Sequence, residues 1–149
     1  MRLCSIASGS SGNCIYVGSD CAHVLIDIGI SGKRMEAGLN SLDLTGRDID
    51  GVLITHEHSD HIKGLGVIAR KYGIPIYTTG GTADALLRSG TMGKIPEGIF
   101  HEIREDEPFF IKDLKINLFT IPHDAAQPVG YRLECGEHSV GIATDLGKY

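Results

Sequence analysis

The sequence has no apolar run near the roughly 20 residues that a membrane-spanning helix needs. Its first eight residues also lack the long apolar core of a secretory signal. The formal net charge is -5, and no cluster of lysine and arginine indicates nucleic-acid binding. We therefore expect a cytoplasmic protein with no membrane partner. A nuclease is not excluded, because bound metal cations change the field around a site.

The four cysteines form no Cys-x-x-Cys pair. They stand at positions 4, 14, 21 and 135. This spacing is typical of neither a zinc ribbon nor a small disulfide scaffold. We expect reduced, mostly buried thiols in a cytosolic protein.

The composition is that of an ordinary globular domain. The chain has 149 residues, which is enough for one domain with a buried core. Hydrophobic residues make up 42% and charged residues 22%, as in typical water-soluble proteins. Glycine is abundant, with 20 residues, which indicates many tight turns and backbone packed close to a site.

Hydrophobic periodicity predicts strands in the first part of the chain, each followed by a helix, and mainly strands later. The predicted strands are 2–7, 14–17, 22–27, 51–55, 75–78, 98–104, 109–111, 114–121, 129–135 and 139–144. The first predicted helix runs through 33–39, with Ser31 as its cap and an end near 42–46, and the others are 62–72 and 82–88. This order favours sheets with helices outside them over an evenly alternating βαβ chain.

The most informative stretch is residues 55–61, Thr-His-Glu-His-Ser-Asp-His, between an apolar strand and a predicted helix. His56 and His58 are two positions apart, so extended backbone points both to one side. Asp60 and His61 can turn toward that side from the first helical residues. Their nitrogen and oxygen atoms suit zinc, manganese or iron. We prefer a metal site to a solvated loop in which Asp60 only caps the helix.

Two later residues occupy similar positions at the ends of apolar strands. His123 follows the strand that ends near residue 121, and Asp145 follows the strand that ends near residue 144. A single residue of this kind is usually structural. Beside the 55–61 motif, both become candidate metal ligands.

Two further features each have two interpretations. Asp27 follows an apolar strand, and it is either an acid beside the metal ligands or a cap or turn acid. The glycine-rich stretch 8–13 either cradles a phosphate with backbone N–H groups or is a plain hairpin turn. The residues alone do not decide between them.

The pattern His-x-His-x-Asp-His at a strand end resembles the metal motif of the metallo-β-lactamase superfamily. Together with residues 8–13, 25–29 and 123–131, it resembles the YycJ/WalJ-type branch, which comprises bacterial cytosolic metallohydrolases linked to exonuclease activity on DNA. The resemblance runs over the whole chain. It implies an α+β fold, the αββα sandwich, in which two stacked sheets carry helices on both outer faces.

The resemblance also implies a role for each candidate residue. Three histidines would form a first metal site: His56, His58 and His123. Asp60 and His61 would bind a second metal, and Asp145 would bridge the two. Asp60 would also act in catalysis by orienting the attacking hydroxide. The cofactors would be two divalent ions, zinc or manganese, with iron as an alternative.

Three functions remain open. The first is a phosphodiesterase or exonuclease that attacks DNA with a hydroxide bridging two metals. The second is hydrolysis of a small thioester or lactam by the same chemistry. The third is a catalytically silent module that binds metal or nucleic acid.

The chain stops four residues after Asp145, before a last ligand histidine that the resemblance implies on a later strand. We therefore expect residues 1–149 to be a domain that is incomplete at its C-terminus, with a weak or empty second metal site and low activity by itself. Exposed sheet surface or an open strand edge would favour a homo-oligomer. The alternative is a short protein that closes its own core.

Overall fold

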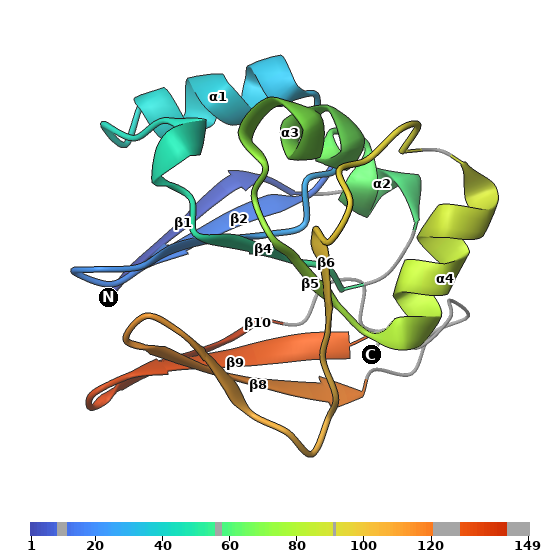
Figure 1. The fold of residues 1–149 in the computed structure, drawn as a ribbon. Helices are drawn as coiled ribbons and strands as arrows, with labels where there is room; N and C mark the ends of the chain where they lie inside the picture. The colour runs from blue at the N-terminus through green and yellow to red at the C-terminus, as the bar shows by residue number, and fades with distance from the viewer. Residues whose placement is uncertain (9–11, 56–57, 91, 121–128, 143–149) are drawn as a thin grey trace.

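Two β-sheets lie face to face, and a layer of helices covers the outer face of one of them (Figure 1). The computed structural model describes residues 1–8, 12–55, 58–90, 92–120 and 129–142, apart from the side chains of Ser59, Asp60 and Thr120. This arrangement is the predicted α+β sandwich. As predicted, the strands of the second half follow one another without helices between them.

The first sheet has six strands in sequence order. They are β1 (Arg2–Ala7), β2 (Cys14–Gly18), β3 (His23–Ile26), β4 (Gly51–Leu53), β5 (Ile76–Thr78) and β6 (Phe100–Glu102). The first three pair antiparallel, and β3 to β6 pair parallel. Parallel neighbours need crossover connections, and helical segments supply all three. As a result, β3, β4, β5 and β6 all end at the same edge of the sheet.

The second sheet has four antiparallel strands in the order β10-β9-β8-β7. They are β7 (Phe109–Ile111), β8 (Leu114–Thr120), β9 (Val129–Cys135) and β10 (His138–Ile142). The predicted hairpin turn at Gly136 is confirmed, with a φ of 60° that favours glycine. In the hairpin of β9 and β10, Cys135 pairs with His138 and Tyr131 pairs with Ile142.

The helices begin and end at residues that favour caps. They are α1 (Gly32–Asn40), the 3₁₀ helix η1 (Gly46–Asp48), α2 (Ser59–Ile62), α3 (Leu65–Tyr72) and α4 (Gly80–Ser89). Ser31 caps α1 as predicted, because its Oγ accepts from the Arg34 N–H at 3.2 Å. Helix α4 begins two residues earlier than predicted, because Thr79 is its cap. Gly73 and Gly90 end α3 and α4 in left-handed backbone.

The predicted single helix over 62–72 is wrong, because the chain forms two helices that break at Gly64. The Gly64 N–H donates to the Ile28 carbonyl at 2.8 Å instead of continuing a helix. A Cβ at Gly64 would lie only 2.2 Å from the Ile30 carbonyl oxygen. The segment after β3 therefore runs directly against the junction between α2 and α3. Close packing with a distant segment, which periodicity does not reveal, decides this break.

The first sheet carries a hydrophobic core on each of its faces. Leu25 points toward the helices, where it joins a cluster with Met35 and Ile68. Val24 and Ile26, on the other face, join the cluster between the sheets. Each fully buried aliphatic side chain of this size contributes about 1.5–3 kcal/mol to folding. Strand β3 is therefore apolar on both faces, as buried parallel strands usually are.

The outer face of the second sheet differs from the expectation of helices on both sides. Among the described residues, no helix covers this face (Figure 1). Phe110 is 65% exposed there, and Arg132 is also exposed. In the part of the chain that the structure describes, the helical layer is therefore one-sided.

The prediction of mostly buried thiols holds only for Cys14, although all four cysteines are free. Cys4 and Cys135 are half-buried, and Cys21 is exposed. Among the described helices, none is long and apolar enough to cross a membrane.

Replacing Gly64 with alanine should destabilise the protein by roughly 1–3 kcal/mol, because the added Cβ would overlap backbone at the α2–α3 junction. Gly141→Ala in β10 is the matched control, since a Cβ there would meet nothing within 4 Å. Urea unfolding of both variants measures the difference. Equal stabilities would contradict the close approach at Gly64.

Candidate metal centre

The candidate site lies where β3 and β4 end. Asp27 follows β3 in left-handed backbone, with a φ of 64° that is unusual for a residue other than glycine. Its N–H still donates to the Leu53 carbonyl at 2.8 Å, so the chain stays bound to β4 as it turns. The turn directs a carboxylate into the protein, where Asp27 is fully buried.

Three hydrogen bonds surround the buried Asp27 carboxylate. Oδ1 accepts from the Thr55 N–H at 2.8 Å, and Oδ2 accepts from the Thr55 hydroxyl at 2.7 Å. Oδ2 also lies 2.5 Å from Nδ1 of His61. A buried carboxylate needs such partners, because removing it from water without them is costly. Asp27 is thus both a turn residue and an acid in direct contact with a candidate metal ligand.

His61 is completely buried in α2, and backbone bonds hold it in place. Its N–H donates to the His58 carbonyl at 2.9 Å, and its own carbonyl accepts from the Ile28 N–H at 2.8 Å. Since a carboxylate can only accept, Nδ1 of His61 carries the hydrogen toward Asp27. This leaves the lone pair on Nε2, which is the arrangement usual for a metal-binding histidine.

Two hydrogen bonds connect the second sheet to this end of β4. The Val129 N–H donates to the Thr55 carbonyl at 2.9 Å. The buried Tyr131 hydroxyl donates to the Ile54 carbonyl at 2.6 Å. Burial, together with the negative charge of Asp27, raises the pKa of Tyr131, so this phenol remains a hydrogen-bond donor.

The registers of β8 and β10 place their ends at the same location. Thr120, the last residue of β8, pairs with Val129, and Ile142, the last of β10, pairs with Tyr131. The ends of β4, β8 and β10 therefore converge. These are the strands after which the sequence places the candidate ligands.

The structure describes the side chains of only two of the six predicted ligands. His58 is half-buried just before α2, and His61 is buried. Asp60 lies in α2, but its side chain is outside the described part. The other three, His56, His123 and Asp145, also lie outside it. The grouping of all six around metal ions therefore stays a prediction.

Sequence reasoning assigned no role to Thr55 or Asn13, although both contact the buried pair. Thr55 supplies two of the three bonds to Asp27. The Asn13 Nδ2 atom lies 3.3 Å from Nε2 of His61. In the sequence, Thr55 stands out only as the first residue of the motif, and Asn13 only as the last residue of the glycine-rich stretch. Neither position indicates that the residue contacts Asp27 or His61.

The glycine-rich stretch packs against the segment after β3. The Gly29 N–H donates to the Asn13 carbonyl at 2.7 Å. Gly12 has a φ of 143°, and a Cβ there would lie 2.5 Å from the Gly29 carbonyl oxygen. Residues 9–11 lie outside the described part, so a phosphate cradle in this stretch stays a prediction.

The family model of the metallo-β-lactamase superfamily matches residues 7–149. The chain belongs to this superfamily. The predicted family and fold are thereby confirmed, and membership implies divalent metal ions at the site. A buried histidine with a carboxylate on Nδ1 and a lone pair on Nε2 fits such an ion.

Among curated proteins, the chain is similar to the exodeoxyribonucleases YycJ and WalJ. It is 40% identical over 144 residues to YycJ of Bacillus anthracis, covering 95% of this chain and 53% of that protein. It is 39% identical over 142 residues to WalJ of Streptococcus pneumoniae, with the same two coverages. The chain thus spans about half the length of these relatives.

Solved structures of metallo-β-lactamases share the fold. A metallo-β-lactamase from Cronobacter sakazakii has a TM-score of 0.78 at 13% identity, covering 93% of this chain and 54% of that one. The Rm3 metallo-β-lactamase has a TM-score of 0.74 at 21% identity, covering 93% and 56%. At such identities, the likeness concerns the fold alone.

Replacing Asp27 with asparagine should weaken metal binding by about 10–100-fold, because the amide no longer fixes His61 with Nε2 free for a metal. The metal-free protein should also lose roughly 1–3 kcal/mol of stability, since buried polar groups lose their partners. Metal titration followed by calorimetry and urea unfolding measures both effects.

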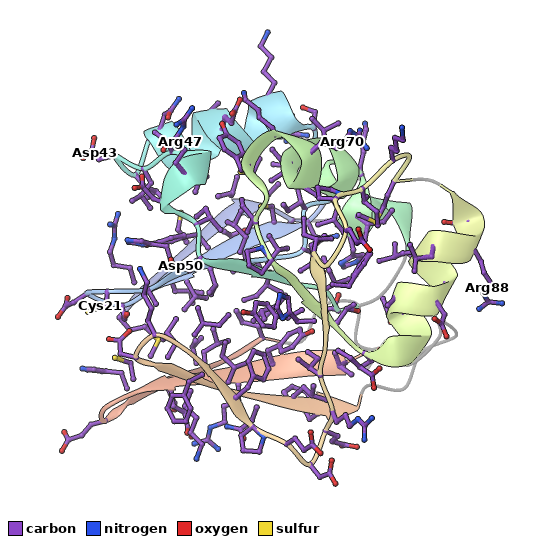
Figure 2. The ribbon with its side chains drawn as sticks, viewed as in Figure 1. Cys21, Asp43, Arg47, Asp50, Arg70 and Arg88 are labelled. Atoms are coloured by element: carbon purple, nitrogen blue, oxygen red, sulfur yellow. The ribbon has the colours of Figure 1, made fainter. Side chains whose placement is uncertain are left out.

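Asp50→Asn is the matched control. Asp50 is also an acid with hydrogen-bonded and charged partners, although it is half-buried whereas Asp27 is fully buried. Its carboxylate accepts from the His23 N–H at 2.9 Å and lies 3.0 Å from Lys112 Nζ. Asp50 precedes β4, whereas the candidate site follows β4. Figure 2 shows Asp50 at the end of the sheets opposite Arg88 of α4. This variant should keep wild-type metal affinity. Unchanged metal affinity in Asp27→Asn would remove Asp27 from the site.

Proposed function

We propose that this chain carries the metal centre of a metal-dependent phosphodiesterase, an exonuclease that acts on DNA in the cytoplasm. The observation that carries the proposal is the buried Asp27–His61 pair at the converging ends of β4, β8 and β10. The names of the relatives YycJ and WalJ, about half of whose length this chain covers, favour DNA as the substrate. The four free cysteines are compatible with a reducing compartment.

In this proposal, six residues would hold two divalent ions. His56, His58 and His123 would hold the first, Asp60 and His61 would hold the second, and Asp145 would serve both. Imidazole and carboxylate ligands suit zinc or manganese, with iron as an alternative. Such ions supply a nucleophilic water at neutral pH and neutralise charge on the phosphoryl oxygens.

Side chains of the protein orient the attacking water and the His61 ring. Asp60 would orient the attacking water by accepting its hydrogen, while Asp27 and Thr55 keep the His61 ring in one orientation. A thiolate nucleophile is unsuitable at Cys14, the cysteine that follows Asn13. Burial, with a further contribution from Asp27, raises the pKa of the Cys14 thiol far above neutral.

A substrate comparison tests this function. The full-length protein restored with zinc or manganese should cleave single-stranded DNA and bis-p-nitrophenyl phosphate, but not thioesters or lactams. His58→Ala should lose both bound metal and cleavage. Turnover of acyl substrates alone would favour a thioester or lactam hydrolase. Metal or DNA binding without any turnover would favour a silent binding module.

In the full-length protein, Asp60→Asn should lower kcat on the phosphodiester by roughly 100-fold or more and change KM little. The reason is that Asp60 acts on the attacking water, whose interaction with the site is strongest in the transition state. Steady-state kinetics on the metal-restored protein separate the two constants. A fall confined to substrate affinity, with near-normal kcat, would remove Asp60 from the mechanism.

A further inference from the structure

Asn13 stands beside the metal-facing nitrogen of His61. Its Nδ2 atom lies 3.3 Å from His61 Nε2, and the residue is only 6% exposed. Asp27 holds the other ring nitrogen, Nδ1, at 2.5 Å. The imidazole is therefore held at both nitrogens, by a carboxylate on one side and an amide on the other.

Only one of these two contacts is compatible with a bound metal. With Nδ1–H donating to Asp27, the lone pair of Nε2 accepts from the Asn13 amide N–H. A metal ion would occupy the same lone pair at about 2.0–2.1 Å from Nε2. The amide and the ion cannot both use it, so Asn13 must release Nε2 when metal binds.

We propose that Asn13 is a positioning residue that occupies Nε2 of His61 in the metal-free protein and thereby lowers the metal affinity of the His61 site. This inference rests on the proposed role of His61 as a ligand. Asn13 keeps the buried ring in place while the site is empty. Metal binding then has to break this hydrogen bond.

Hydrogen bonding and close packing fix the backbone around Asn13. The Asn13 carbonyl accepts from the Gly29 N–H at 2.7 Å, and Gly12 packs directly against the Gly29 carbonyl. In this proposal, the Asn13 side chain therefore rotates away from Nε2 while its backbone stays in place. A hydrogen bond present only in the metal-free state, with a typical net worth of about 1 kcal/mol, weakens metal binding about fivefold.

The test measures stability and metal affinity in the same variants, Asn13→Ala and Asn13→Asp. Asn13→Ala should lower the Tm of the chelator-treated protein yet bind zinc or manganese about fivefold more tightly. Asn13→Asp has nearly the same size but places a carboxylate, which cannot donate, beside Nε2. It should destabilise the metal-free protein and tighten metal binding more than Asn13→Ala does. Calorimetric titration and thermal unfolding provide both readouts.

Gly12→Ala is the control for a purely structural effect, because it strains the same loop without touching His61. It should lower the metal-free Tm with no gain in metal affinity. Asn13 variants that behave like Gly12→Ala, or that match wild type in both readouts, would overturn the role of Asn13 while the proposed function stands. If His61→Ala in the full-length protein retains the wild-type metal stoichiometry and affinity, His61 is not a ligand, and both the inference and the assigned site fail.

Discussion

The site depends on the burial of one carboxylate, Asp27, against Thr55 and His61. This carboxylate joins the turn after β3, the end of β4 and helix α2, which are separate in sequence. Burying the Asp27 charge without these partners would cost several kcal/mol. The folded protein is therefore stable only when the three elements stay together around the carboxylate. Satisfying the carboxylate also orients the imidazole, so one set of bonds serves both stability and the site.

The fold brings these elements together because parallel strands end at the same edge of a sheet. Strands β3 and β4 deliver Asp27 and Thr55 side by side, and Val129 and Tyr131 bind the second sheet to the same point. The candidate ligands therefore follow rigid strands, which suits a site that must hold ions in fixed geometry. Membership of the metallo-β-lactamase superfamily agrees with this arrangement.

Several elements were predictable because their signals are local. Strands β1, β7 and β9 have the predicted bounds, and Ser31, Gly73 and Gly136 act as caps and turn as expected. The break at Gly64 was not predictable, because the backbone that excludes a side chain there comes from residues 28–30. Helix α2 begins at Ser59, so Asp60 and His61 lie in its first turn, as the motif predicted.

The sequence alone determined most strands and helices and the candidate ligands, because ligand chemistry and hydrophobic period are properties of short stretches of chain. The family and its two-sheet fold followed from the resemblance of the motif. Only the tertiary structure decided that Asp27 faces His61, that Thr55 satisfies the same carboxylate and that Asn13 lies at the opposite ring nitrogen. Those contacts join residues 28, 34 and 48 positions apart. Spacing in sequence carries no information on such pairs, since the orientation of a buried side chain is set by the partners that the fold brings to it.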